Sequence, residues 1–336
     1  MKGHSEKLKR SAGNISTPDM IFAYVFVLQD KIRGILKYRR TYRDYFNVIM
    51  HIIMGKYPFQ ATLRNGQPIV LNNHFAVSVI GDSEGSELIE CDVTNDVITI
   101  FSSPNIGDDK LKVKLYGGVY DGDVLATFLS NRYEFLPVKR RIVIDIGANI
   151  GDTAIFFALS GANRVISIEP FPKNYELAKK NIESNNLSDR ITLMLAGCAS
   201  NSSYITIDPE YNSNARSVLG DDFKHGIKVP LLTLDDILTQ NDLSLPNGRG
   251  NIILKMDCEG CEYQTILSAS ESTLQCFSHI FIEYHDGYKN LKERLEKAGF
   301  IVSVSRPIMV KDHDYFYTSH FVGYLYAKRD NDTNEI

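Results

Sequence analysis

Apolar stretches of strand length alternate with stretches of helical periodicity in the part of the chain that follows Pro137. The predicted strands are 141–146, 164–168, 191–196, 252–256 and 279–283. The predicted helices are 152–159, 172–186, 262–268 and 290–298. Strands that alternate with helices form parallel βαβ units with right-handed crossovers. We therefore predict an α/β fold with a doubly wound, mostly parallel, seven-stranded sheet over residues 137–330, closed by an antiparallel edge hairpin of 301–305 and 320–327.

The segment that precedes this domain has a different rhythm. Two helical stretches are predicted first, the second near 42–54, and short β-rich runs follow. Asn65-Gly66 lies between two of these runs and predicts a tight hairpin turn with positive φ. The predicted strands of this region are 61–64, 67–71, 96–101 and 111–116. We predict a smaller helical and β-rich amino-terminal domain over 18–136, behind a polar, disordered tail at 1–17.

Composition limits the class of protein. The chain has 336 residues, 43% of them hydrophobic and 23% charged, as expected for a folded protein with a main domain and a smaller one. A formal net charge of −4 gives no global attraction to nucleic acid. The longest apolar run near the amino terminus, Met20 to Leu28, is shorter than the roughly 20 residues of a spanning helix. We therefore expect no membrane span and no nucleic-acid substrate.

Two further features of the composition bear on location and partners. The five cysteines are an odd and sparse set rather than a disulfide framework, which favours a reducing compartment, and we expect a cytoplasmic protein. A basic cluster of Lys37, Arg39, Arg40 and Arg43 lies between the two predicted amino-terminal helices. It is either a solvated helix end or a patch for an acidic substrate or a membrane surface.

The first candidate site is a glycine turn between the strand predicted at 141–146 and the helix after it. Gly147 and Gly151 allow the backbone to approach a ligand, and Asn149 is the non-glycine residue best suited to a left-handed conformation. The spacing differs from the G-x-G-x-x-G of dinucleotide sites, which argues against a nicotinamide cofactor. Asp145, which we expect to face the cofactor, would repel a pyrophosphate but suits an amino-bearing sulfonium. A turn that binds no ligand is the alternative.

Glu169 ends the next predicted strand and precedes Pro170. In cofactor sites of this topology, a carboxylate at this place accepts hydrogen bonds from both ribose hydroxyls. We assign that role to Glu169. The alternative is a surface glutamate at the end of a strand.

A third group of residues follows the strand predicted at 252–256 and lies at the same edge of the sheet, where open α/β folds bind ligands. Asp257 and Glu259 are candidates for a general base, for a divalent-cation site or for orienting the substrate. Alternatively they cap the helix that follows. Cys258 and Cys261 form a C-x-x-C pair, which without a second pair nearby is a weak indication of redox or zinc chemistry.

The last group is formed by Glu283 and His285, at the end of the next strand. Strand alternation directs both side chains to the same side. His285 is a second candidate base, because an imidazole titrates near neutral pH. A purely structural histidine is the alternative.

In this combination the motifs resemble the FkbM-type methyltransferase family, over roughly residues 138 to 300. The resemblance rests on the segments 145–151, Glu169-Pro170, 232–238, 254–260 with Glu262, and Ile282-Glu283. It implies a class I, Rossmann-like methyltransferase sheet with Asp145, Gly147, Asn149 and Glu169 at S-adenosylmethionine. Members of the family methylate hydroxyls of sugars or secondary metabolites, so the resemblance implies a glycan, glycolipid or small-molecule hydroxyl as the acceptor.

We therefore predict an S-adenosylmethionine-dependent methyltransferase that acts on a hydroxyl oxygen. The candidate cofactor contacts are Asp145, Gly147, Asn149, Gly151, Asp152, Glu169, Pro170 and Ala196. The candidate catalytic residues are Asp257, Glu259 and His285. No residue is assigned as a metal ligand, although a divalent cation is compatible with the chemistry. A nicotinamide-linked oxidoreductase and a non-catalytic cofactor-binding module are the alternatives.

Overall fold

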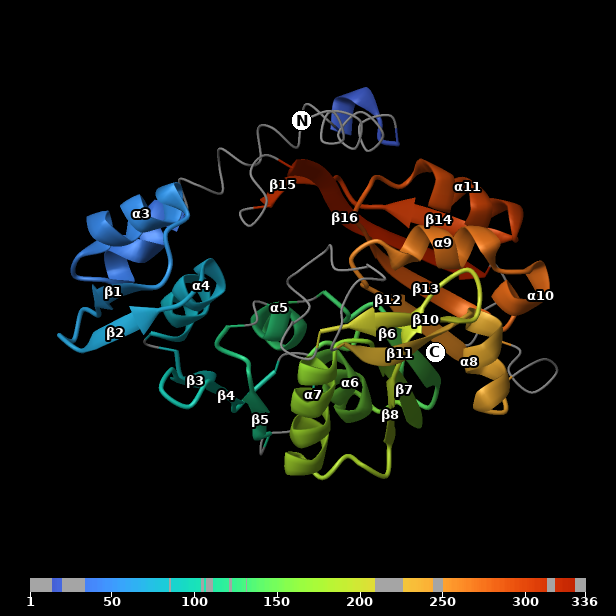
Figure 1. The fold of residues 1–336 in the computed structure, drawn as a ribbon, viewed down its shortest axis with the longest axis horizontal. Coiled ribbons are helices and arrows are strands. Elements are labelled where there is room, and N and C mark those ends of the chain that lie inside the picture. The colour runs from blue at the N-terminus through green and yellow to red at the C-terminus, as the bar shows by residue number, and fades with distance from the viewer. Residues whose placement is uncertain are drawn as a thin grey trace. The chain divides into compact units, whose positions relative to one another are not determined.

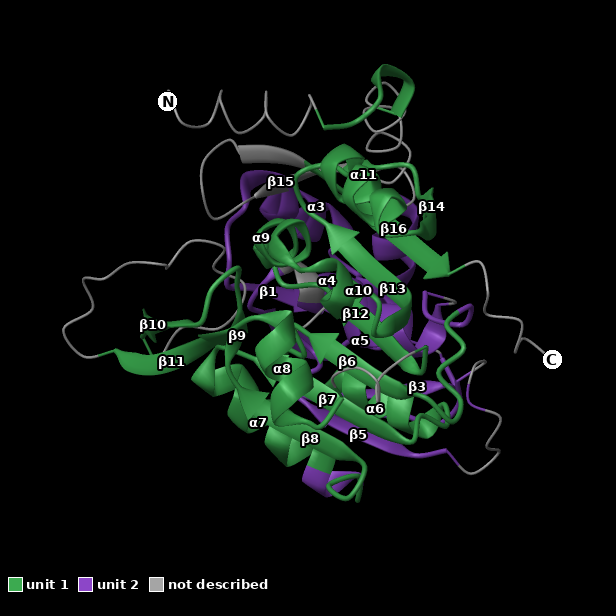
Figure 2. Ribbon diagram, turned by 90° about the vertical axis from the view of Figure 1, so that its right-hand side faces the viewer, with its two compact units in different colours: residues 1–24, 136–182, 186–336 green, residues 25–135, 183–185 purple. Residues whose placement is uncertain are grey.

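The computed structural model describes residues 14–19, 34–84, 86–103, 106, 111–120, 123–130, 132–208, 226–243, 250–312 and 318–329 (Figure 1). The chain divides into two compact units (Figure 2). Unit 1 comprises Met1–Tyr24, Leu136–Ile182 and Asn186–Ile336, and unit 2 comprises Val25–Phe135 and Glu183–Asn185. The main segment of unit 1 thus begins at Leu136, one residue before the boundary predicted from the sequence.

Unit 1 is built on one large, mostly parallel sheet, as the hydrophobic pattern predicted. Its strands, in spatial order, are β14 (Phe300–Val304), β16 (Thr318–Arg329), β13 (Phe277–Tyr284), β12 (Ile252–Met256), β6 (Ile142–Ile146), β7 (Arg164–Glu169) and β8 (Ile191–Leu195). The short strand β15 (Ile308–Asp312) pairs with β16 outside this path. Strands β13, β12, β6, β7 and β8 run parallel, and the order reverses beside β6. The carboxyl ends on either side of that reversal are where such sheets bind ligands.

The carboxyl-terminal hairpin differs in one respect from the prediction. Strands β14 and β16 pair antiparallel, as predicted, but β16 also pairs antiparallel with β13 and therefore lies inside the sheet. Only β14 is an edge strand of this pair. Phe321, Leu325 and Ala327 of β16 are all buried, which is the pattern of an interior strand.

Helices cover both faces of this sheet. Their bounds are α6 (Asp152–Leu159), α7 (Pro172–Ser184), α8 (Leu234–Gln240), α9 (Cys261–Ser268), α10 (Glu271–Leu274) and α11 (Lys289–Lys297). Ile144 and Ile146 belong to the hydrophobic cluster that also contains Ile266 of α9 and Leu291 of α11. Because successive side chains of a strand point to opposite faces, Asp145 lies on the other face, the face that α6 covers.

A second, small sheet follows β8 in unit 1 and was not predicted. It consists of β10 (Ser203–Ile207), β11 (Ile227–Leu232) and the two-residue strand β9 (Gly197–Cys198). A strand of two residues is too short to leave a period in the sequence. Helix α8 begins directly after β11 with a capping box, in which Thr233 and Asp236 bond each other's backbone N–H groups.

Residues 14–16, which the sequence placed in a disordered tail, contact the carboxyl-terminal part of unit 1. The side chain of Asn14 donates to the carbonyl of Asp286 at 2.8 Å and to Asn290 Oδ1 at 2.9 Å. Ile15 is buried. Residues 1–13 of the predicted tail lie outside the described residues.

Unit 2 contains helices and two small antiparallel sheets. The helices are α3 (Tyr45–Met54), α4 (His74–Ser83) and α5 (Asp123–Leu129), and the strands are β1 (Phe59–Thr62), β2 (Pro68–Leu71), β3 (Ile89–Asp92), β4 (Val97–Ile100) and β5 (Val113–Tyr116). The predicted hairpin is confirmed, since β1 pairs with β2 around Gly66, whose φ is 90°. Within the described residues of the chain, no helix combines the length and the apolar character needed to cross a membrane.

Candidate active site

The glycine turn after β6 packs against the chain that leaves β12. Gly147 has a φ of 81°, and a Cβ atom built on it would lie 1.7 Å from the carbonyl oxygen of Asp257. Its N–H donates to the carbonyl of Ile168 at 3.0 Å. The glycine is therefore required by the contact between two neighbouring strand ends, in addition to any approach of a ligand. Asn149 has a φ of 49°, which confirms the left-handed conformation predicted for it.

Asp145 does not face the edge of the sheet as the sequence suggested. Its carboxylate is fully buried, accepts a hydrogen bond from Thr153 Oγ1 at 2.7 Å and lies 2.9 Å from Lys255 Nζ. The alternation of strand β6 points this side chain into the layer between the sheet and α6. The structure thus corrects its role from a cofactor contact to one half of a buried ion pair.

Lys255 was missed by the sequence analysis. It lies in the otherwise apolar strand β12 and is buried, and its ammonium group also donates to the carbonyl of Gly147 at 3.0 Å. One cation therefore holds both the acid of β6 and the first residue of the glycine turn. The signal was present, because a lysine inside an apolar strand requires a buried partner.

Glu169 lies at the end of β7, next to the glycine turn. Its Oε1 accepts from the N–H of Phe171 and its Oε2 from the N–H of Asn149, each at 2.9 Å. The side chain is buried, and this burial raises the pKa of Glu169 to about 8 against the effect of both hydrogen bonds. A carboxylate oxygen accepts more than one hydrogen bond, so both oxygens keep capacity for a hydroxyl donor.

The other predicted cofactor contacts surround this pair of strand ends. Gly151, with a φ of 84°, is the residue before α6, and a Cβ atom built on it would lie 3.2 Å from Ala178 of α7. Asp152 is the first residue of α6 and is buried. Pro170 follows Glu169 and is partly buried, and the N–H of Ala196 donates to the carbonyl of Glu169 at 3.3 Å. All four therefore lie at the same edge of the sheet.

His285 is the centre of a carboxylate cluster at the ends of β12 and β13. Its Nδ1 lies 2.9 Å from Glu262 Oε1, and its Nε2 lies 3.7 Å from Asp257 Oδ1 and 3.6 Å from Glu259 Oε2. Burial by itself lowers the pKa of His285, but Glu262, with Glu259 and Asp257, raises it to about 10. These acids favour the protonated ring, which argues against a free imidazole base, and the catalytic role of His285 stays a prediction.

The acids of this cluster differ in their access to solvent. The side chain of Asp257 is 16% exposed and that of Glu259 is 48% exposed, whereas Glu262 is fully buried. Glu262 Oε1 also accepts from the N–H of Cys258 at 3.1 Å, so it fixes both the ring and the turn before α9. Asp257 and Glu259 are thus the two candidate catalytic acids that a substrate can reach.

The C-x-x-C pair forms a disulfide between Cys258 and Cys261, with a Cα–Cα distance of 5.5 Å. Cys91, Cys198 and Cys276 are free thiols. The single bond closes the turn that carries Glu259, which has a φ of 57°. Its only signal in the sequence was the two-residue spacing of the cysteines.

Comparison with known proteins bears on this arrangement. Residues 145–302 match the family model described as the methyltransferase FkbM domain. This part of the chain is an FkbM methyltransferase domain. The matched segment includes both groups of residues at the strand ends, from Asp145 to His285.

Solved structures and curated sequences were also compared. A transferase from Pyrococcus horikoshii is 15% identical, with coverage of 70% of this chain and 73% of that chain and a TM-score of 0.36. The FkbM methyltransferase of Methylobacillus flagellatus is 16% identical, with coverage of 62% and 53% and a TM-score of 0.38. The precorrin-6y C5,15-methyltransferase of Geobacter metallireducens is 16% identical, with coverage of 68% and 100% and a TM-score of 0.32. These likenesses say nothing of the substrate. No curated protein sequence matches the chain.

Proposed function

We propose that this FkbM methyltransferase domain uses S-adenosylmethionine to methylate a hydroxyl of a sugar, a glycolipid or a secondary metabolite. The observation that carries the proposal is the placement of Glu169, a buried carboxylate at the end of β7 that binds the backbone of the left-handed turn at Asn149. The same edge of the sheet presents Asp257 and Glu259 at the end of β12. The ends of β7 and β12, on either side of β6, would thus carry a cofactor side and an acceptor side.

The residues of the first group fit this cofactor. Glu169 would accept the ribose hydroxyls, and the turn from Gly147 to Gly151 would lie along the cofactor, where no side chain projects from either glycine. The buried pair of Asp145 and Lys255 would hold that turn in place without contacting the ligand. When bound, S-adenosylmethionine supplies a methyl group on a positively charged sulfur.

On the acceptor side, the chain positions the hydroxyl and receives its proton. Glu259 is the residue that we propose as the proton acceptor, because its carboxylate is the more exposed of the two and lies beside Asp257 in this group of acids. His285 would orient Asp257 and Glu259, since its Nε2 faces both of them. Positioning and proton removal are the main contributions that a protein makes to methyl transfer.

Calorimetric titration with S-adenosylmethionine tests the cofactor. We expect binding by the wild type and a loss of affinity of at least about tenfold in Glu169→Gln, because an amide cannot accept two hydroxyl donors as a carboxylate does. Glu176→Gln, which changes an exposed glutamate of α7, is the matched control and should bind as the wild type does. Titration with NADH should show no binding. Binding of NADH instead would favour the oxidoreductase, and binding without turnover of any acceptor would favour the non-catalytic module.

The pH dependence of this affinity provides an independent readout. Without cofactor Glu169 is protonated at neutral pH, since its pKa is about 8, whereas hydroxyl donors favour the ionised carboxylate. Binding then releases this proton, so the affinity should rise by up to about tenfold per pH unit from pH 6 towards 8 and level off above it. Glu169→Gln has no proton to release there and should lose this slope. A flat profile in the wild type would contradict the release of a proton from Glu169 on binding.

A further inference from the structure

The ends of β12 and β13 bring together three side chains of the kinds that bind metal ions. Asp257, Glu283 and His285 each offer one ligand atom, and these atoms lie within 4.8 Å of one another. Metal–oxygen and metal–nitrogen bonds of about 2.0–2.5 Å place neighbouring ligand atoms at about 3–4.5 Å. Small side-chain rotations are therefore enough for all three to bind one ion.

The surroundings of His285 match those of a metal-binding histidine. Such a histidine has one ring nitrogen on the metal and donates the other N–H to a carboxylate, which fixes the ring. Here Glu262 Oε1 holds Nδ1 at 2.9 Å and also binds the N–H of Cys258, so Nε2 is directed toward Asp257 and Glu259. His285 and Glu262 are buried, so this orientation is fixed by packing as well.

The charge of the cluster also favours a cation. Four carboxylates, those of Asp257, Glu259, Glu262 and Glu283, are gathered around one buried imidazole, so the cluster is negative even when the ring is protonated. In addition, Glu262 Oε2 is buried without a hydrogen bond among the described residues. Excess negative charge of this kind is costly unless a cation compensates it.

We propose that Asp257, Glu283 and His285 bind a divalent cation, which replaces the proton on His285 Nε2, and that this ion holds the acceptor hydroxyl. Three protein ligands leave coordination positions open, and two of these suit an acceptor with adjacent hydroxyls, such as a vicinal diol. The mixed set of two carboxylates and one imidazole favours Mn²⁺ or a similar ion. The coordinated hydroxyl loses its proton to Glu259, and its oxygen then bonds to the methyl carbon as the carbon–sulfur bond breaks, so no oxidant or reductant is consumed. The catalytic part of this inference rests on the proposed function, whereas the binding of the ion does not.

Titration of the full chain with Mn²⁺ alone, followed by electron paramagnetic resonance of the free ion, tests the site. We expect one bound ion per chain, and a loss of affinity of at least about tenfold in Asp257→Asn and in Glu283→Gln. Both substitutions preserve side-chain size. Glu293→Gln, which changes an exposed residue of α11, is the control and should bind as the wild type does.

The outcomes separate this inference from the proposed function. Failure of folded wild-type protein to bind Mn²⁺ overturns the metal site, whatever the result with S-adenosylmethionine. Equal binding by wild type, Asp257→Asn and Glu283→Gln also overturns it, because the ion then binds elsewhere. Binding of Mn²⁺ that depends on these two residues supports the site, even if S-adenosylmethionine does not bind and the proposed function fails.

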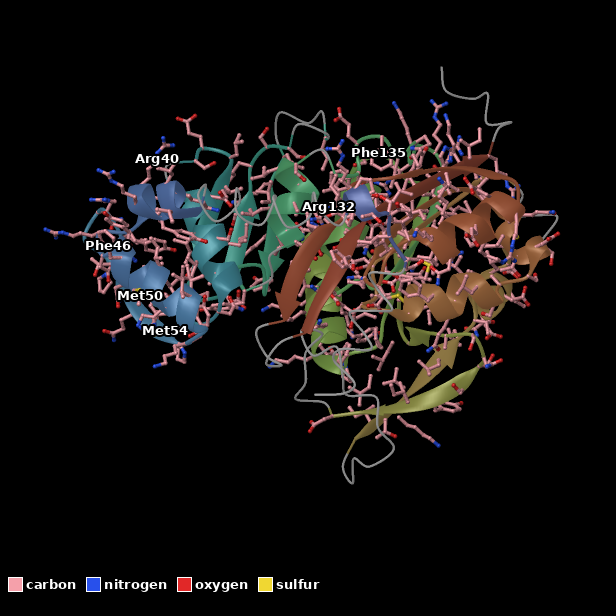
Figure 3. All side chains as sticks on the ribbon, turned by 90° about the horizontal axis from the view of Figure 1, so that it is seen from above. Arg40, Phe46, Met50, Met54, Arg132 and Phe135 are labelled. Atoms are coloured by element: carbon pink, nitrogen blue, oxygen red, sulfur yellow. A yellow bond between two sulfur atoms is a disulfide. The ribbon has the colours of Figure 1, made fainter. Side chains whose placement is uncertain are left out.

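A separate observation concerns the surface of unit 2. Phe46, Met50, Ile53 and Met54 of α3 are 69%, 51%, 71% and 47% exposed. Their spacing of three and four residues places them on one face of the helix, and Figure 3 shows Phe46, Met50 and Met54 in succession along α3. Exposed apolar patches of this kind mark contact surfaces. Val48, on the opposite side, is the buried residue of this helix.

The charges beside this apolar face identify the kind of partner. Arg39, Arg40, Arg43 and Lys56 are exposed at the two ends of α3, and the helix itself contains no acidic residue. A second copy of the chain would bring these like charges together, which is unfavourable. An apolar helix face flanked by basic residues instead suits the plane of an anionic lipid surface. The basic cluster predicted from the sequence is thus joined to an apolar face.

From this combination we infer that α3 and its flanking arginines dock unit 2 on an anionic membrane surface. Co-sedimentation of the full chain with phosphatidylcholine vesicles, with and without phosphatidylglycerol, tests this. We expect binding only to the anionic vesicles, lost in Phe46→Ser/Ile53→Ser and weakened about fivefold per residue in Arg39→Gln and Arg40→Gln. Tyr204→Ser/Ile227→Ser, which removes exposed apolar residues of unit 1, should bind as the wild type does. No binding to anionic vesicles, or a dimer that only Phe46→Ser/Ile53→Ser dissolves, would overturn the inference.

Discussion

Replacing Gly147 by alanine should destabilise unit 1 by on the order of 4 kcal/mol or more. The added Cβ would lie 1.7 Å from the carbonyl oxygen of Asp257, and that oxygen belongs to backbone, which cannot rotate away as a side chain does. The two strand ends must therefore separate, which also disturbs the hydrogen bond from Gly147 to Ile168. Chemical denaturation followed by circular dichroism measures the change.

Gly250→Ala is the matched control for this prediction. Gly250 also belongs to unit 1 and has a similar φ of 74°, but a Cβ atom on it would meet no described residue within 4 Å. It should cost only the strain of a left-handed alanine, about 1 kcal/mol. If both variants are destabilised equally, the positive φ accounts for the effect and the contact with Asp257 does not.

The elements of the large sheet were predictable because each leaves a local pattern. Ile142–Ile146 and Ile252–Met256 are short apolar runs. The helix after the first run begins at the predicted residue, and the helix after the second begins one residue earlier than predicted. The parallel direction of these strands follows from the helices that connect them, with right-handed crossovers. The site at the carboxyl edge of the sheet could therefore be predicted from these runs and the acids that end them.

The contacts between strands that are distant in sequence could not be predicted in this way. Lys255 and Asp145 are direct partners in the register of β12 and β6, but no local pattern records which strands become neighbours. For the same reason the raised pKa of His285 could not be predicted, because it depends on acids of another segment, Glu262 above all. Contacts between segments that are distant in sequence decide the role of a titratable residue, whereas the sequence shows only its type.

Lys255→Met should have the second large effect, a loss of about 3–5 kcal/mol in the free energy of unfolding. The methionine preserves the length of the side chain but leaves the fully buried carboxylate of Asp145 without its cation, 2.9 Å away in the wild type. It also removes the hydrogen bond to the carbonyl of Gly147. The urea midpoint of the unfolding transition gives the measurement.

Two further variants determine the cause of this loss. Lys255→Met/Asp145→Asn should regain much of it, because a neutral amide is far cheaper to bury than an unpaired carboxylate and can still accept from Thr153. Lys292→Met breaks an ion pair with Glu296 whose side chains are 40% and 47% exposed, and it should change stability by less than about 0.5 kcal/mol. If the double variant is no more stable than Lys255→Met, the stranded charge of Asp145 is excluded as the cause. The contact of Lys255 with the glycine turn would then be the interaction that stabilises this edge of the sheet.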